Sequence, residues 1–162
     1  MIDNCIPDGT AIKNQGFIIK QATIDDLVAV TDILAKLYDE HDYNELLEEN
    51  KSHLTKDTQI ILLASDAGTT VGAVHASIRR EYVEGRIDDL PIGYLEGIYV
   101  EPEYRLKGIV RKLTEECQSW AKSRGCSCFA SDCELDNTES LKFHIRTGFQ
   151  EISRNIHFIK ML

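Results

Sequence analysis

The sequence has no excess of positive charge, since it carries 18 Lys and Arg against 27 Asp and Glu, a formal net charge of −9. Such a field repels a phosphate backbone and attracts cations, so no nucleic-acid partner is expected. Long hydrophobic runs are also missing. The apolar run at residues 60–64 is far shorter than the roughly 18 residues of a membrane-spanning helix. No membrane partner is expected either.

Little in the sequence points to export, disulfides or metal. The first eight residues hold neither a basic region nor an apolar one, so no secretory signal is expected. The five cysteines form an odd set, which suits free thiols in a reducing compartment. Cys126 and Cys128 lack the two-residue gap of a zinc knuckle, and the five histidines have no ligand spacing to them. We therefore expect a cytoplasmic protein without metal, whose cysteines are small apolar side chains.

What is present fits a single folded domain. The chain has 162 residues, of which 43% are hydrophobic and 28% charged, values typical of one soluble globular domain. No internal repeat, low-complexity tract or linker divides it. Residues 1–16 contain Pro7, Gly9 and Gly16 without periodicity. We expect them to form a loosely held N-terminal extension to a single domain at residues 17–162.

Hydrophobic periodicity predicts strands that alternate with helices. Strands are expected at residues 17–21, 59–65, 71–79, 92–100, 128–131 and 155–161. Helices are expected from residue 23 to about 38, within the acidic stretch 39–49, from residue 108 to the glycine at 125, and at 137–146. A glycine-containing turn at 66–70 predicts a hairpin, and Gly97 predicts a bulge or a close backbone approach. The order predicts an α/β fold of the mixed α+β type, in which helices cover one central sheet.

The segment at residues 94–110 is the most informative one. A strand ends there, a basic loop follows, and a helix begins with its free N–H groups and positive dipole end directed at the loop. Arg105, Lys107 and Arg111 add cationic side chains to a protein that is acidic as a whole. The pattern indicates an anion cradle suited to a diphosphate. An ordinary strand-to-helix connection is the alternative.

The motif Val100-x-Pro102-x-x-Arg105-x-x-Gly108-x-Val110 resembles the acetyl-CoA pyrophosphate loop of the GNAT acetyltransferase superfamily, Arg/Gln-x-x-Gly-x-Gly/Ala, with Val110 in place of the last small residue. The segment from Asn137 to Gly148-Phe149 is similar to the last helix of that family. The resemblance covers nearly all of residues 17–162. It implies the GNAT acyltransferase fold, a mostly antiparallel, splayed sheet flanked by helices, and acetyl-CoA as co-substrate. The implied cofactor-binding residues are Ile98, Tyr99, Val100, Arg105, Leu106, Lys107, Gly108, Ile109, Val110, Arg111, Asn137 and Ser140.

A narrower resemblance concerns the acceptor side. The segments 76–85, 95–98, 130–132 and 148–151 are similar to the aminoglycoside 6′-N-acetyltransferases. This implies acetyl transfer to the 6′ amine of a polycationic amino sugar, for which carboxylates and aromatic rings make an apt wall. Tyr38 stands where relatives carry Trp. The implied substrate-binding residues are Tyr38, Asp39, Tyr82, Glu84, Asp88, Glu96 and Asp132.

The chemistry of acetyl transfer assigns further roles under this resemblance. The acceptor amine must lose a proton, since a lysine-like amine has a pKa of about 10.4. We expect Asp132 to position the amine and accept its proton, directly or through water, and Glu96 to share this work or hold a neighbouring ammonium. Backbone N–H groups at residues 98–100 would polarise the acetyl carbonyl. His144 stands where many members carry a Tyr that protonates the departing thiolate, and packing beside the sulfur is the alternative.

Other readings stay open at this point. A GNAT enzyme for another polycation, such as a polyamine, would suit the net charge equally well. A CoA-binding regulatory protein without catalysis is a candidate from another class. Ile156, Phe158 and Ile159 offer apolar surface near a sheet edge, so a homodimer is a further expectation.

Overall fold

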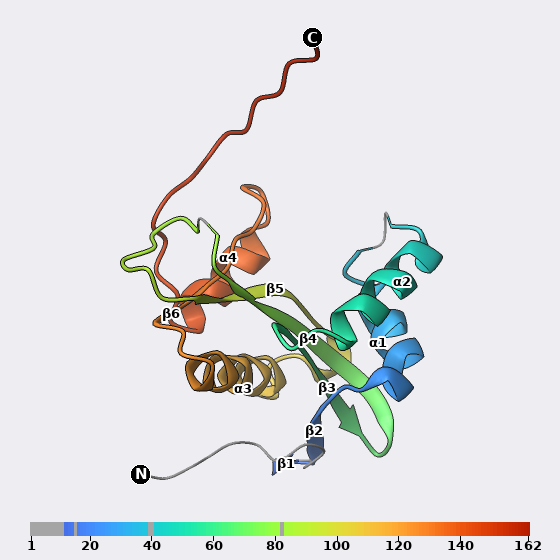
Figure 1. Cartoon of the computed structure of the whole chain (residues 1–162). Coiled ribbons are helices and arrows are strands. Elements are labelled where there is room, and N and C mark those ends of the chain that lie inside the picture. The colour runs from blue at the N-terminus through green and yellow to red at the C-terminus, as the bar shows by residue number, and fades with distance from the viewer. Residues whose placement is uncertain (1–11, 15, 39–40, 82) are drawn as a thin grey trace.

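Six strands in chain order form the central sheet of the part of the chain that the computed structural model describes, residues 12–14, 16–38, 41–81 and 83–162 (Figure 1). Neighbouring strands are antiparallel except for the last pair, which is parallel. The prediction of a mixed, mostly antiparallel sheet is therefore confirmed. The strands are β1 (Ile12–Asn14), β2 (Phe17–Gln21), β3 (Gln59–Asp66), β4 (Thr69–Arg79), β5 (Ile92–Val100) and β6 (Cys128–Ala130).

Four α-helices accompany the sheet in the described residues: α1 (Leu27–Leu34), α2 (Tyr43–Leu54), α3 (Ile109–Ser123) and α4 (Thr138–Arg146). Two short 3₁₀ helices lie at Ile24–Asp26 and Pro102–Tyr104. Figure 1 shows α1 and α2 together on one side of the sheet, α3 on the other, and α4 beyond it near β6. The side chain of Asp42 caps α2 by accepting hydrogen bonds from the backbone N–H groups of Asn44 and Glu45 at 2.9 and 3.1 Å. The acidic stretch thus begins a helix, as predicted.

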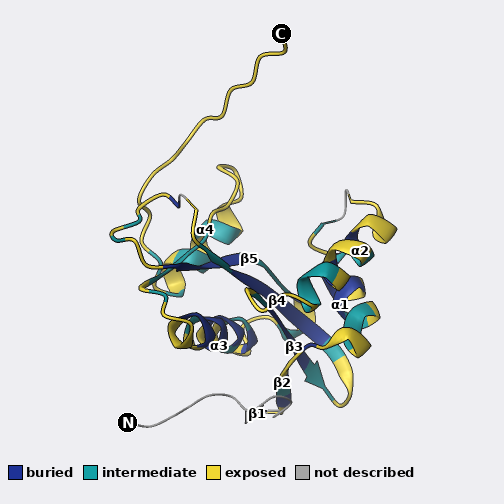
Figure 2. Ribbon diagram, viewed as in Figure 1, coloured by how far each residue is buried: buried dark blue, intermediate teal, exposed yellow. Residues whose placement is uncertain are grey.

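The strands β3 and β4 bury side chains on both faces of the sheet. Ile60 and Leu62 pack with α3 on one face, whereas Ile61 and Leu63 pack with α1 on the other. Figure 2 shows this as buried central strands between partly exposed helices. The β3–β4 hairpin forms as predicted. Its turn holds Ala67 and Gly68 at φ 47° and 85°, the left-handed pair that matches the twist of a two-residue hairpin.

The sequence prediction was wrong at the C-terminal end of the chain. No strand forms at residues 155–161, and residues 149–162 contain neither helix nor strand. Figure 1 shows this segment leaving the domain as an extended tail. A strand exists only when a neighbour satisfies its backbone groups, and no described strand lies beside this segment. Its apolar side chains are therefore exposed, with Phe158 at 91% and Ile159 at 92% of their full accessible area.

Two smaller differences occur near the N-terminal end. The first helix ends at Leu34 rather than near Tyr38, because the N–H of Leu37 bonds to the carbonyl of Leu34 and closes a tighter turn. Within the predicted extension, Ile12–Asn14 pairs with β2 as the short edge strand β1. Residues 1–11 lie outside the described part of the chain. Nothing in the described residues forms a helix long and apolar enough to cross a membrane.

Candidate active site

A bulge in β5 sets the position of Glu96, between β4 and the edge strand β6. His75 on β4 pairs with Gly97, and the next β4 residue, Ala76, pairs with Leu95, so Glu96 is the extra residue of β5. A Cβ at position 97 would lie 2.5 Å from the Tyr38 hydroxyl oxygen and 2.8 Å from a methyl carbon of Leu37. The expectation of a bulge and a close approach at Gly97 is confirmed. Only glycine lets Tyr38 lie directly against β5.

A gap opens between β5 and β6 immediately after this bulge. The parallel pairing is limited to Ile92–Tyr94 with Cys128–Ala130, whereas β5 continues to Val100. The last contact is the Ser131 hydroxyl, which donates to the Leu95 carbonyl at 3.1 Å. Beyond it, no described strand pairs with the edge of β5 that faces away from β4, along residues 96–100. Such an edge can bind an extended ligand by backbone hydrogen bonds.

The predicted anion cradle lies at the end of the same strand. Arg105 Nε donates to the Val100 carbonyl at 3.0 Å, which holds the loop against β5. Gly108 is the residue before α3 and has φ 84°, and Leu106 also has a left-handed φ of 61° and is 97% exposed. The first N–H groups of a helix lack partners within the helix. In α3 these are the N–H groups of Ile109, Val110 and Arg111. The Lys107 Nζ lies 4.7 Å from the centre of the Tyr104 ring.

This local structure fits a diphosphate at the N-terminus of α3 and an extended arm along β5. Two other predicted cofactor residues have a structural role that can be seen directly. Asn137 caps α4, where its side-chain oxygen accepts from the N–H of Ser140 at 3.0 Å. Ser140 in turn contacts His144 through both its hydroxyl and its carbonyl.

Glu96 is bound by an arginine that sequence reasoning missed. Arg79 on β4 donates from Nε to Oε1 at 3.1 Å and from a terminal nitrogen to Oε2 at 2.6 Å, and the Ser77 hydroxyl donates to Oε1 as well. Glu96 and Arg79 are both partly exposed, at 23% and 38% of their side-chain areas. One signal was available in the sequence. His75, Ser77 and Arg79 alternate within an otherwise apolar strand, so they share one face of β4.

Asp132 has a second missed partner, Tyr94 on β5. The buried phenol of Tyr94 donates to Asp132 Oδ1, and burial together with this bond raises the pKa of Tyr94, which stays protonated. The Arg79 guanidinium lies over the Tyr94 ring at 3.4 Å from its centre. Arg79 therefore connects the two carboxylates. The structure brings Glu96 and Asp132 into one network beside the gap between β5 and β6.

His144 lies on α4 between two aromatic rings. Its ring centre is 4.8 Å from Phe143 and 5.1 Å from Phe149. Nδ1 lies 2.7 Å from the Ser140 carbonyl, which can only accept, so Nδ1 carries a proton and donates it. Nε2 is buried and has no hydrogen-bond partner among the described residues. A buried nitrogen without a partner is one that a ligand or a proton can still use.

The predicted acceptor residues are not all brought together. The Tyr38 hydroxyl lies 3.4 Å from the Glu96 carbonyl, beside the network. Asp88 instead accepts from the Leu90 N–H and the Ser127 hydroxyl at 2.9 and 3.0 Å, at the opposite end of β6 from Asp132. Glu84 is exposed in the same loop. Asp39 and Tyr82 lie outside the described residues.

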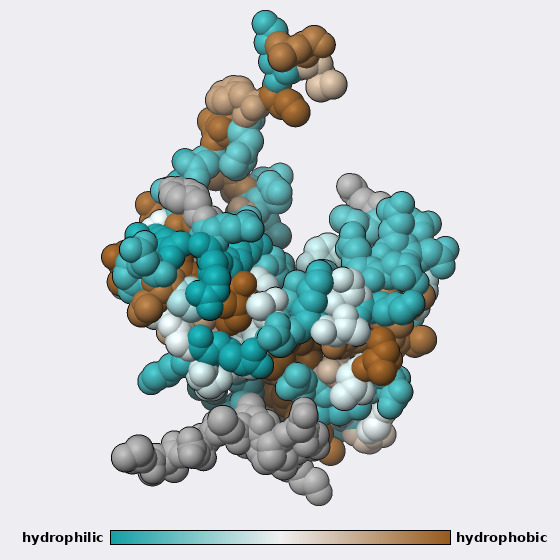
Figure 3. Space-filling model, in the orientation of Figure 1, coloured by the Kyte–Doolittle hydropathy of each residue, from teal (hydrophilic) through white to brown (hydrophobic). Residues whose placement is uncertain are grey.

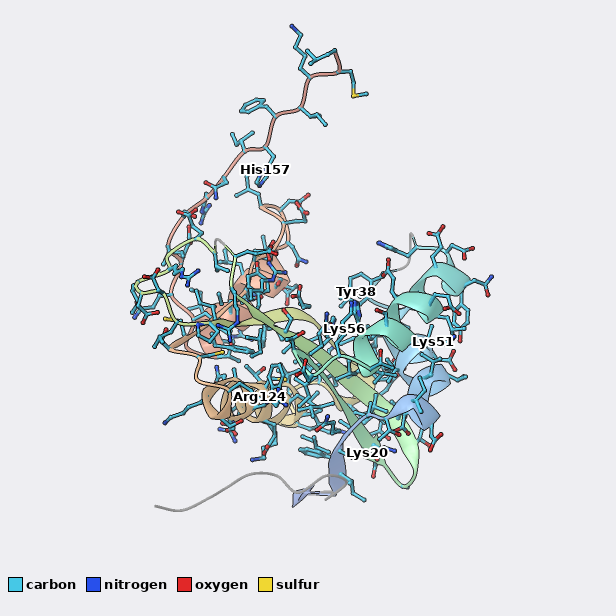
Figure 4. The ribbon with its side chains drawn as sticks, in the orientation of Figure 1. Lys20, Tyr38, Lys51, Lys56, Arg124 and His157 are labelled. Atoms are coloured by element: carbon cyan, nitrogen blue, oxygen red, sulfur yellow. The ribbon has the colours of Figure 1, made fainter. Side chains whose placement is uncertain are left out.

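Figure 3 shows the surface hollowed between the part with α1 and α2 and the part with α4, above the central strands. Tyr38 lies on the side of the α1–α2 unit that faces these strands (Figure 4). Across the described ranges, no group of three or more His, Cys, Asp or Glu side chains is arranged to hold a metal ion. The four cysteines in those ranges are free thiols.

Buried His75 predicts that folding stability depends on pH. Burial, then the nearby His53 and Arg79, lower its pKa to about 3 from an ordinary 6.5. The unfolded chain therefore binds a proton below pH 6.5 that the folded chain does not, and the free energy of unfolding falls as pH is lowered from 6.5 towards 3. We expect a contribution of up to about 1.4 kcal/mol per pH unit.

Urea unfolding of wild type and His75→Gln at pH 7, 6 and 5 checks this expectation. The variant should lose less stability on acidification than the wild type. His41→Gln, at an exposed position, is the matched control and should behave as the wild type. Identical pH dependence in wild type and His75→Gln would contradict the assignment.

Comparisons with known proteins agree with this geometry. The model of the acetyltransferase (GNAT) family matches residues 27–149. An aminoglycoside N(6′)-acetyltransferase type 1 from Acinetobacter genomosp. 13 is 40% identical over 124 residues, which are 76% of this chain and 84% of that protein. The solved structure of AAC(6′)-Iy with the bisubstrate analog CoA-S-monomethyl-acetylneamine has a TM-score of 0.85 at 31% identity, covering 91% of this chain and 100% of that one.

A second solved structure gives the same result. The aminoglycoside antibiotic 6′-N-acetyltransferase AAC(6′)-Ih from Acinetobacter baumannii matches with a TM-score of 0.85 at 35% identity, covering 91% of this chain and 99% of that one. The family match includes α1 to α4 and therefore the bulged strand, the anion cradle and both carboxylates. The chain belongs to the acetyltransferase (GNAT) family.

Proposed function

We propose that this protein transfers the acetyl group of acetyl-CoA to the 6′ amine of aminoglycosides. The observation that carries the proposal is the pair of carboxylates, Glu96 and Asp132, joined through Arg79 and Tyr94 beside the gap between β5 and β6. An acetyl group bound in that gap would meet an amine held by these carboxylates. The names of the relatives support this acceptor class over a polyamine.

The hydrogen bonds suggest how the two carboxylates divide the work. Arg79 and Ser77 bind both oxygens of Glu96, so this carboxylate suits holding charge rather than accepting a proton. Tyr94 binds only Oδ1 of Asp132, which leaves Oδ2 to accept the proton of the amine. The neutral amine nitrogen then bonds to the thioester carbonyl carbon and gives its second proton to solvent as it becomes the amide nitrogen, while the carbon–sulfur bond breaks and the thiolate leaves.

Two parts of the proposal concern the cofactor end. Backbone N–H groups at residues 98–100 would bind the arm and polarise the carbonyl, and residues 105–111 would bind the diphosphate, with Asn137 and Ser140 beside the arm. His144 remains the proposed proton donor to the leaving thiolate. Because Nδ1–H bonds to the Ser140 carbonyl, His144 donates from Nε2, and it does so as an imidazolium.

Acceptor binding is proposed for Tyr38, Glu84, Glu96 and Asp132, in an acidic protein that attracts polycations. Asp88 contributes only if the loop at residues 83–91 releases it from Ser127. Asp39 and Tyr82 stay predictions. We also propose a cytoplasmic location, which free cysteines and the use of acetyl-CoA support.

The function is tested by thiol release from acetyl-CoA with kanamycin and with an analogue that carries a 6′ hydroxyl in place of the amine. We expect turnover with kanamycin and none with the 6′-hydroxyl analogue. Turnover with neither, together with reaction of spermidine, would move the function to polyamine acetylation. Binding of acetyl-CoA without turnover of any amine would instead favour a regulatory role.

A homodimer is proposed through the C-terminal tail. Ile156, Phe158 and Ile159 are exposed at 76%, 91% and 92%, an arrangement that suits burial against a second copy. β6 is the last strand of the sheet, and no strand in the described part of the chain pairs with its outer edge. We expect light scattering to give about twice the 18.3 kDa of one chain. The double substitution of Phe158→Asp and Ile159→Asp should give one chain, and a wild-type mass of one chain would contradict the proposal.

A further inference from the structure

A small pocket lies between α1, α2 and β4, next to the proposed acceptor site. Its volume is about 80 Å³. A cavity needs only about 10–15 Å³ to hold one water molecule, so this pocket has room for an amino group and the carbon that bears it. Tyr38, Glu49, His53 and His75 are among the residues that line it.

Two stacked imidazoles form one side of the pocket. The rings of His53 on α2 and His75 on β4 lie 4.5 Å apart at an angle of 27°. Nε2 of buried His75 lies 2.5 Å from Gln59 Oε1, to which it donates. Nδ1 of His53 is buried and has no hydrogen-bond partner among the described residues. Leaving a buried polar atom unpaired is costly, so this nitrogen suits a donor that enters from outside.

The charges around the pocket favour a cation as that donor. Burial and Lys56 lower the pKa of His53, while Glu49 and Glu96 act in the opposite direction. Burial and then the same two carboxylates raise the pKa of Tyr38. His53 is therefore neutral at pH 7 and offers a lone pair. The negative charges of Glu49 and Glu96 act to raise the pKa values of His53 and Tyr38, two residues that line the pocket. Glu49 itself also lines the pocket.

Tyr38 places the pocket next to the proposed reacting centre. Tyr38 lines the pocket, and its hydroxyl lies 3.4 Å from the carbonyl of Glu96. The absence of a side chain at Gly97 permits this position, since a Cβ there would lie 2.5 Å from the hydroxyl oxygen. An acceptor whose reacting amine is held by Glu96 and Asp132 therefore has this pocket as a neighbour.

We propose that the pocket binds a second, non-reacting amino group of the acceptor. The ammonium donates to Nδ1 of His53, Glu49 supplies the opposite charge, and Tyr38 separates this group from the reacting amine. The inference rests on the proposed function and deepens it. It predicts that amino sugars with two or more amino groups are better acceptors than monoamines because of these residues.

The test compares His53→Phe with wild type on two acceptors. Phe retains a ring to stack on His75 but lacks the nitrogen that accepts. Neamine carries several amino groups, and methyl 6-amino-6-deoxyglucoside carries one. We expect His53→Phe to raise KM for neamine about tenfold, the size of one lost hydrogen bond to a charged group, with kcat unchanged. The monoamine should show no change in kcat/KM.

Glu49→Gln is the second variant, since Glu49 is exposed and its replacement does not threaten folding. It should also raise KM for neamine alone. Glu48→Gln is the matched control, because Glu48 is the preceding residue of α2 and pairs with Lys51 at 3.6 Å. It should change neither acceptor.

The outcomes separate the two proposals. Equal losses on both acceptors in His53→Phe and Glu49→Gln, or no loss on either, would overturn the pocket assignment while leaving the proposed function in place. A wild-type protein that acetylates neither acceptor would overturn the proposed function and this inference with it. A KM effect confined to neamine supports the pocket.

Discussion

Replacing Asp132 with Asn is expected to lower kcat for aminoglycoside acetylation by about a hundred- to ten-thousandfold, the usual range for the loss of a general base. The amide still accepts the hydrogen bond of Tyr94, so local structure is retained. It cannot accept a proton from the ammonium of the acceptor. KM for acetyl-CoA should stay unchanged, because the anion cradle at residues 105–111 lies on other elements.

Steady-state rates with kanamycin and acetyl-CoA measure this effect. Asp136→Asn is the matched control, since Asp136 is an exposed carboxylate of the same segment before α4. It should keep wild-type turnover. If Asp132→Asn turned over at the wild-type rate, another group would be the base and the proposed division of work between the carboxylates would be wrong.

Replacing Glu96 with Gln is expected to lower kcat/KM for the aminoglycoside by roughly a hundredfold, about 2.7 kcal/mol, mainly through KM. The wild-type carboxylate neutralises the Arg79 guanidinium through two hydrogen bonds. Without that charge, Arg79 is an unpaired cation next to Tyr94 and repels an incoming ammonium. The loss thus combines a missing attraction with a new repulsion.

A double variant that combines Glu96→Gln with Arg79→Gln separates the missing attraction from the new repulsion. Removing the guanidinium from Glu96→Gln should restore about tenfold of the lost kcat/KM, although Arg79→Gln alone lowers the activity. Rates for all four proteins complete the cycle. Strictly additive losses would show that Arg79 and Glu96 act independently, contrary to their hydrogen-bonded geometry.

The elements that sequence reasoning predicted correctly are those that local patterns determine. The apolar spacing of α3 and the glycine before it are properties of one short segment. Gly97 was a correct signal for the same reason, because a glycine inside a strand marks a bulge or a close approach. The predicted strand at residues 155–161 failed because a strand needs a neighbour. Composition shows only that a segment suits pairing.

The partners of the carboxylates could not be predicted in the same way. Arg79 reaches Glu96 because of the register of β4 and β5 and the bulge that shifts it by one residue. Tyr94 reaches Asp132 because β5 and β6 run in parallel for only three residue pairs before they diverge. The alternating polar residues of β4 indicated a polar face, but they did not indicate what it faces.

The sequence by itself determined the strands and helices between residues 17 and 146, apart from the end of the first helix, together with the glycine-containing loop before α3 and the resemblance to acetyltransferases. These depend on periodicity, on glycine positions and on motif spacing along the chain. The tertiary structure alone decided that Glu96 is held by Arg79, that Asp132 is bound by Tyr94, and that His53 and His75 meet beside Tyr38. The physical reason is that such contacts depend on cross-strand register and on the packing of α2 against the sheet, to which residues far apart in the chain contribute.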